Sequence, residues 1–118
     1  MHVLTQHGVP FAGKIPFFQS AELIQSKKQA ERLAQILGDK SVVVMKNHGI
    51  TVVGKTIEET VILAMDFERA AQEHLLATTF GKPSGMPVAM AKKLSANNYA
   101  PAQFRMLWDY YWKKFNRS

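Results

Sequence analysis

The sequence contains no cysteine. Without thiols the chain can form neither a disulfide framework nor a thiolate metal site. No apolar run approaches the ~18 residues that a membrane-spanning helix needs, so we expect no membrane partner. Residues 1–7 lack the basic region and apolar core that are typical of a secretory signal. Together these absences predict a cytoplasmic protein.

Acidic residues are scarce, with nine Asp and Glu against 15 Lys and Arg, which gives a net charge of +6. An excess of positive charge raises the question of a nucleic-acid partner. However, the basic residues are spread over several expected helices, and no segment interleaves basic and aromatic residues on a strand as RNA-binding sheets do. We therefore expect solvated surface charge and no nucleic-acid partner.

What is present suits a single small domain covering residues 1–118. The hydrophobic content of 47% is normal for a globular chain. Six Met, seven Phe and two Trp supply enough apolar material for one modest core. A chain of 118 residues is of single-domain size, although its large surface relative to its volume leaves little margin of stability.

The order of the periodic segments predicts an α/β fold. Residues 8–18 carry two Gly and two Pro among apolar residues, which favours an extended segment or edge strand over a helix. Capping boxes at Ser26–Gln29 and Thr56–Glu59 predict helices over 27–37 and roughly 57–80. Between these helices, strands 41–46 and 50–54 are separated by a tight turn and should pair antiparallel. Helices near 88–96 and 102–115 follow a Gly- and Pro-containing linker at 81–87.

Apolar spacing predicts which face each helix buries. In the first helix the expected buried residues are Ala30, Leu33, Ala34 and Leu37, with Gly38 ending the helix in a left-handed conformation. In the long helix they are Ile57, Val61, Ala64, Phe67 (or Glu68), Ala71 and Leu75. We expect Asp66, Arg69 and Glu73 on its solvent side.

The last expected helix is apolar nearly all round. Its proper stripe consists of Phe104, Leu107, Trp108, Tyr111 and Phe115. Met106, Tyr110 and Trp112 lie off that stripe, and a helix of this kind is usually covered on more than one side. In so small a chain, a second subunit would supply the cover. The sequence therefore predicts a homo-oligomer, unless the linker folds this helix back so that both faces are covered.

His48 lies in the expected turn between the two strands, directly before Gly49. A neutral imidazole at the end of a buried strand is rigidly placed, and the glycine lets the backbone turn without a Cβ clash. These properties suit a zinc ligand, but a lone histidine in a hairpin is also a common polar turn residue. The other histidines, His2, His7 and His74, have no metal-ligand spacing relative to His48, so spacing alone leaves the site incomplete.

Residues 41–83, "SVVVMKNHGITVVGKTIEETVILAMDFERAAQEHLLATTFGKP", resemble the C-terminal half of the class II aldolase/adducin family. In that family an apolar strand runs into a His-Gly turn, a second strand ends in Val-Gly, and a long helix follows. Upstream, "GKIPFF" and "AERLAQILGDK" also fit the family pattern. Downstream, "FRMLWDYYWKKF" resembles the aromatic C-terminal helix of its decarboxylase-like members. The residues matched in order within 41–83 are His48, Gly49, Val52, Val53, Gly54, Thr56, Glu58, Glu59 and Ala71.

The resemblance implies part of a three-layer α-β-α fold with a mainly antiparallel central sheet. It also implies a Zn2+ site built from three histidines, in which His48 is the third ligand. The family's H-x-H pair and catalytic carboxylate come from an N-terminal half that this sequence lacks. We therefore expect a fragment, inactive alone, whose catalytic residues are unknown.

For the complete enzyme the resemblance implies a zinc-dependent carbon–carbon lyase acting on a small hydroxy/oxo carbonyl substrate. Retro-aldol cleavage or decarboxylation would pass through a metal-stabilised enediolate. Tyr110 and Tyr111 would either reach a neighbouring subunit's site or pack in an interface. A non-catalytic, adducin-like interaction domain is the alternative.

Overall fold

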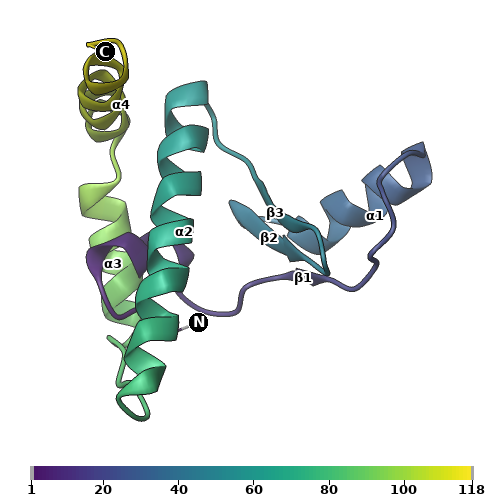
Figure 1. Cartoon of the computed structure of the whole chain (residues 1–118), viewed down its shortest axis with the longest axis horizontal. Coiled ribbons are helices and arrows are strands. Elements are labelled where there is room, and N and C mark those ends of the chain that lie inside the picture. The colour runs from purple at the N-terminus through teal and green to yellow at the C-terminus, as the bar shows by residue number, and fades with distance from the viewer. Residues whose placement is uncertain (1, 118) are drawn as a thin grey trace.

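The computed structural model describes residues 2–117 and contains a small mixed sheet placed between helices (Figure 1). The strand order is β1 (Phe17–Phe18), β2 (Val42–Met45), β3 (Gly49–Val52). β1 pairs parallel with β2, and β2 pairs antiparallel with β3 from Val42 opposite Val52 to Met45 opposite Gly49. The predicted antiparallel hairpin is therefore confirmed, and β1 is the edge strand expected within residues 8–18.

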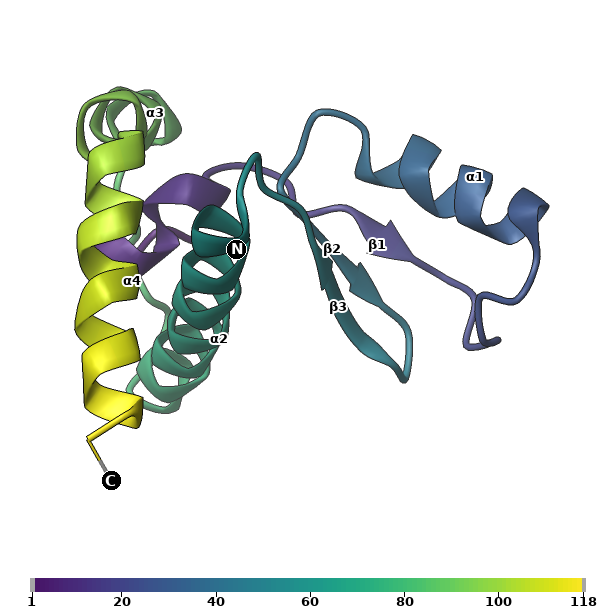
Figure 2. The same cartoon turned by 90° about the horizontal axis from the view of Figure 1, so that it is seen from above.

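Helices cover both faces of the sheet, which gives three layers (Figure 2). α1 (Lys27–Leu37) lies on one face. The other face is covered by a layer of η1 (Gln6–Phe11), α2 (Ile57–Thr79), α3 (Val88–Asn98) and α4 (Pro101–Phe115). Side chains of a strand alternate between faces, so Val43 and Met45 pack toward α1, and Val42 and Val44 pack toward the helical layer. This arrangement confirms the predicted α/β fold class.

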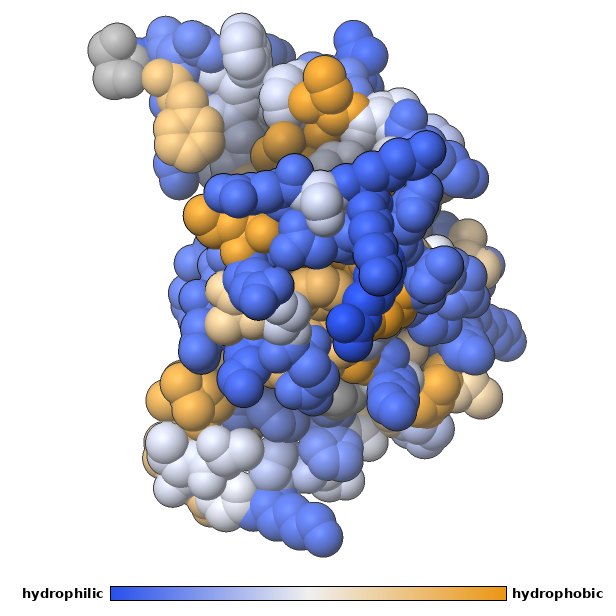
Figure 3. Space-filling model, turned by 90° about the vertical axis from the view of Figure 1, so that its right-hand side faces the viewer, coloured by the Kyte–Doolittle hydropathy of each residue, from blue (hydrophilic) through white to orange (hydrophobic). Residues whose placement is uncertain are grey.

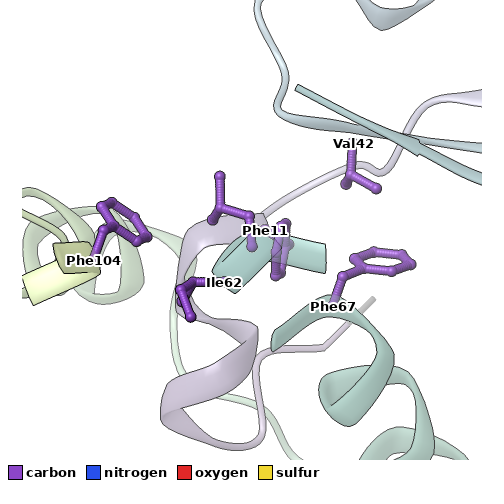
Figure 4. Packing of buried hydrophobic residues seen from close by; sticks show 6 residues of the cluster. Phe11, Val42, Ile62, Phe67 and Phe104 are labelled. Carbon is purple, nitrogen blue, oxygen red and sulfur yellow. The ribbon is translucent and has the colours of Figure 1, made fainter. Parts of the chain in front are cut away.

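The main core lies between the sheet and the helical layer. Figure 4 shows Phe11 of η1, Val42 of β2, Ile62 and Phe67 of α2, and Phe104 of α4 pointing toward one another. The rings of Phe11 and Phe67 meet edge to face with centroids 5.1 Å apart, a favoured aromatic geometry. This cluster joins four segments that are far apart in the sequence, so it fixes the sheet against the helices.

The helix starts follow the predicted capping chemistry, with one difference. At Ser26 the complete box is present: its hydroxyl accepts from the Gln29 N–H, and the Gln29 side chain accepts from the Ser26 N–H. Thr56 likewise accepts from the Glu59 N–H, but the Glu59 carboxylate accepts from the N–H of Lys55 rather than of Thr56. Both boxes therefore stabilise a helix start, the second in a shifted form.

The prediction of extended backbone over 8–18 was wrong for residues 8–11, which belong to the 3-10 helix η1. Pro10 lies inside this helix. A short 3-10 helix of about two turns requires few backbone donors, so a proline disturbs it little. η1 buries Val9 and Phe11 in two different apolar clusters. Tertiary packing thus outweighs the local signal of the glycines and prolines.

The predicted buried face of the long helix was also wrong in part. Phe67 is buried as expected, together with Ile62, Leu63 and Ala70, whereas Ile57, Val61, Ala71 and Leu75 are exposed. Asp66 and Glu73, expected in solvent, are half-buried. α2 contacts both η1 and α4, so the buried arc faces the groove between two neighbours instead of a single stripe. In α1, Leu33, Ile36 and Leu37 carry the packing, while Ala30 and Ala34 are exposed.

Candidate functional site

The turn that carries His48 is held by backbone geometry. Residues 46–48 connect β2 to β3, and the His48 N–H donates to the Met45 carbonyl at 3.2 Å. Asn47 has φ 54° and Gly49 has φ 127°, both in the positive region that Asn and Gly tolerate best. The backbone conformation of these two residues bends the chain between the strands. The turn therefore has a defined shape on which the imidazole is mounted.

His48 itself is exposed to solvent. It lines an open hollow of about 450 Å³ between the hairpin and α1, whose other walls include Leu23, Ile24, Met45 and Thr51. The closed end of the hairpin lies clear of α2, α3 and α4 (Figure 2). An accessible imidazole beside an apolar hollow is suited to bind a metal together with groups that approach from outside the chain.

Within residues 2–117, no three His, Asp or Glu side chains come together as a metal site would require. The other histidines lie elsewhere: His2 stacks on His74 with centroids 5.8 Å apart, and His7 contacts α2. Four-coordinate zinc commonly takes three protein ligands even in open catalytic sites. His48 fits one of these positions, and the described residues do not supply the rest.

A second polar cluster, which the sequence did not predict, joins the N-terminal segment to α2. The His7 Nδ1 lies 3.1 Å from a Glu73 carboxylate oxygen, and its Nε2 lies 3.3 Å from Arg69 Nη1. Thr5 donates its hydroxyl to the same Glu73 carboxylate. The partners are separated by more than 60 residues, so no local spacing could have revealed them. The cluster fixes the N-terminal segment on α2.

Asp66 and Tyr99 lie in a hollow of about 430 Å³ between η1, α2 and α4. Burial raises the pKa of the Asp66 carboxyl, partly offset by the nearby charges of His7 and Arg69. Burial also raises the pKa of Tyr99, whose hydroxyl donates to the Gln6 carbonyl at 2.7 Å. Burial thus favours the neutral form of both groups relative to the same groups in water. Both groups are far from the His48 turn in the sequence.

The C-terminal helix leaves part of its apolar surface uncovered, as predicted. Met106, Tyr110 and Trp112 are 60%, 60% and 58% exposed, while Tyr111 is half-buried and packs against the main core. By contrast, the side of the molecule that Figure 3 shows is mostly hydrophilic, with apolar residues in separate small patches. None of the described helices is long and apolar enough to span a membrane.

The strand, turn, strand and helix that surround His48 match a known family profile. The profile of the class II aldolase and adducin N-terminal domain matches residues 1–75. The chain belongs to the class II aldolase and adducin family. Membership agrees with the resemblance seen in the sequence, and it covers all three strands and most of α2.

Among curated relatives of this family, a 3,4-dihydroxyphthalate decarboxylase from Rhodococcus jostii is 30% identical over 69 residues. The match covers 58% of this chain and 28% of that protein. The chain therefore spans about a third or less of the length of the curated relatives that it matches.

Solved structures of class II aldolases share the fold. An aldolase II superfamily protein from Pseudomonas syringae superposes with a TM-score of 0.79 at 22% identity, over 97% of this chain and 47% of that one. L-fuculose 1-phosphate aldolase from Glaciozyma antarctica gives a TM-score of 0.76 at 21% identity, over 98% and 43%. The arrangement of sheet and helices is thus that of about half of such a protein.

Proposed function

We propose that this chain is the C-terminal portion of a class II aldolase-type lyase, a single domain in which His48 supplies one ligand of a zinc site. The observation that carries the proposal is the exposed His48 imidazole on a turn of defined shape, in a chain of this family. The remaining ligands and the acid/base group would come from an upstream half that carries an H-x-H pair.

The chain's own residues would place the ligand. β2 is packed on both faces, by α1 through Val43 and by the main core through Val42, so the strand that leads to His48 cannot move independently of either layer. The positive φ values of Asn47 and Gly49 then set the direction of the turn. A bound zinc would supply Lewis-acid stabilisation of the negative charge that develops when a carbon–carbon bond next to a carbonyl breaks. Lys46, the first residue of the turn, is exposed.

The names of the relatives support a proposal for the substrate class. One is a decarboxylase of a dihydroxy aromatic acid and one an aldolase of a sugar phosphate, and both names describe carbon–carbon lyases. We infer a small hydroxy/oxo carbonyl substrate for the complete enzyme, cleaved by decarboxylation or by retro-aldol reaction. The open hollow beside His48 has apolar walls that would exclude part of the solvent from such a substrate.

A test of this function joins the chain to an upstream half from a family member that carries the H-x-H pair. We expect the joined protein to release carbon dioxide from dihydroxy aromatic acids or aldehyde from ketose phosphates. His48→Ala should remove most of that activity, whereas His2→Ala, which removes another exposed imidazole, should not. Full activity in the His48→Ala protein would contradict the assignment.

The second candidate is a non-catalytic, adducin-like interaction domain. It is favoured by one observation: the residues described supply a single candidate ligand and no complete metal site. In that case the joined protein would bind no zinc stoichiometrically and would turn over neither substrate class. For both candidates we propose a cytoplasmic homo-oligomer whose contact surface includes the exposed face of α4.

A further inference from the structure

A third hollow lies at the other end of β2 from His48. It has a volume of about 390 Å³ and is formed by η1, the segment leading to β1, the start of β2, and α3. Ser41 and Val42 line it, whereas His48 follows the end of the strand at Met45. At roughly 3.3 Å per residue, the strand alone separates the two sites by about 10 Å. The hollow therefore does not belong to the proposed metal site.

The walls of this hollow combine apolar and cationic groups. Its apolar surface comes from buried or partly buried residues that include Val9, Phe11 and Ile15. Three lysines and one aspartate supply its charged groups, which are Lys14, Lys40, Lys92 and Asp39. The hydroxyls of Ser41 and Ser95 add two groups that can donate hydrogen bonds. The lining is thus net positive around an apolar wall.

Among the three lysines that line the hollow, Lys40 is neutralised by contact with a described carboxylate. Lys40 Nζ lies 3.2 Å from an Asp39 carboxylate oxygen. Within residues 2–117, no carboxylate lies within 4 Å of the ammonium of Lys14 or of Lys92. Two unpaired cations that border one hollow raise its local positive potential and attract an anion.

Backbone geometry places two of these lysines. Gly13, which precedes Lys14, has φ +101°, and Gly38, two residues before Lys40, has φ +59°. Residues with a Cβ rarely adopt such values, so glycine is needed to turn the chain at both points. The lysines therefore follow fixed turns rather than lying on a free loop.

We propose that this hollow binds a small organic anion, with a carboxylate or phosphate held by Lys14 and Lys92 and an apolar or aromatic body against the wall. The positive charge of the lysines favours an acidic group on the ligand. The apolar lining favours an apolar or aromatic body on the same ligand. Ser41 and Ser95 would donate to the remaining oxygens of the acid. This site is additional to the proposed zinc site and does not require it.

The test uses the 118-residue chain and a matched pair of probes, 2-naphthoate and its neutral analogue 2-naphthamide. Binding is followed by the backbone amide shifts of Ser41, Ser95 and Ala96 in NMR titrations. We expect naphthoate to bind at least fivefold more tightly than naphthamide, and its affinity to fall as salt screens the lysines. Equal affinities, or shifts confined to other parts of the chain, would overturn the proposal.

Two lysine variants with equal net charge separate the site from the overall charge of the protein. Lys92 lines the hollow, and the next residue, Lys93, does not. Lys92→Met should weaken naphthoate binding about threefold to fivefold, the upper range for an exposed ion pair. Lys93→Met should leave it within about 1.5-fold. If both variants weaken binding equally, attraction is due to net charge alone and the proposal fails.

A third variant tests the apolar wall. Ala96 lines the hollow and is exposed, so Ala96→Trp should fill it without disturbing the core. We expect this variant to lose naphthoate binding by tenfold or more while keeping its circular dichroism spectrum. Should the Trp variant be misfolded, Lys14→Met tests the location of the site through the charge of another lining residue, with an expected loss of about fivefold. Unchanged binding in a folded Ala96→Trp protein would contradict the assigned location.

Discussion

Asp66 is an acidic residue whose pKa the fold raises by burial. It lies on α2, half-buried, and desolvation raises its pKa above the ordinary value of 3.8. Folded protein therefore keeps the Asp66 proton in a pH range where unfolded protein has released it. The free energy of unfolding falls as pH rises through that range, and at neutral pH the cost of burying the charge is fully present.

Replacing Asp66 by Asn should remove that cost. We expect Asp66→Asn to raise the Tm at neutral pH by about 1–3 °C, a modest gain because the carboxylate is partly hydrated. The gain should disappear below the ordinary Asp pKa, where the wild-type carboxyl is protonated in both states. Thermal unfolding at both pH values measures this, with Glu68→Gln as an exposed control on the same helix. A lower Tm for Asp66→Asn at neutral pH would show that His7 and Arg69 attract the carboxylate more than burial disfavours it.

At the scale of elements, α2 offers a matched comparison of one residue type in two environments. Leu63 is 4% exposed in the main core, whereas Leu75, about three turns later, is 70% exposed. Leu63→Ala should lower the free energy of unfolding by about 2–5 kcal/mol through lost burial and a cavity. Leu75→Ala should change it by less than about 0.5 kcal/mol. Urea unfolding gives both values, and similar losses would mean that the helix is rotated from the observed orientation.

The start of α1 is a second test at this scale. Ser26→Ala removes the hydroxyl that accepts from the Gln29 N–H and should cost about 1 kcal/mol. Ser84→Ala in the linker, where no capping bond is present, should cost almost nothing. Urea midpoints of the two variants compare them directly. An equal, small effect would indicate that packing of Leu33 and Leu37 alone holds α1.

The helices and strands were largely predictable because their signals are local. Ser26 and Thr56 mark helix starts through hydrogen bonds that span three residues, and the β-branched run before Asn47 marks a strand. The 3-10 helix at residues 6–11 and the buried face of α2 were not predictable from local signals. Both depend on which distant segments pack there, and α2 is apolar on more sides than its neighbours cover.

The candidate functional residues were likewise predictable only in part from the sequence. His48 was visible as a histidine before a glycine between two strands, and the structure places it exposed in that turn. Its other ligands stay a prediction, since residues outside this chain would supply them. The pairing of His7 with Glu73 could not be predicted because the partners are 66 positions apart in the sequence.

At the scale of the whole molecule, the exposed face of α4 predicts self-association. Trp112 is exposed and stacks on Trp108 with centroids 5.8 Å apart, which makes a broad aromatic surface. Exposed aromatics that cluster on one helix mark interfaces. We expect a homo-oligomer at micromolar concentration, measured by light scattering, and a shift toward monomer or aggregate in Trp112→Glu.

Lys113→Gln is the control for that variant, because it changes the net charge by the same amount on the same helix. We expect it to keep the wild-type mass. A single species at 13.3 kDa for the wild-type chain would contradict the predicted assembly.

The zinc content of two proteins tests the role of His48 most directly: the 118-residue chain alone and the chain joined to an upstream H-x-H half. We predict weak or no binding by the chain alone, because one imidazole cannot hold the metal, and one zinc per joined protein by elemental analysis. His48→Ala should abolish that zinc, and His2→Ala should retain it. Tight zinc binding by the 118-residue chain alone, or full zinc in the joined His48→Ala protein, would contradict the assignment of His48 as a ligand of a site completed from outside this chain.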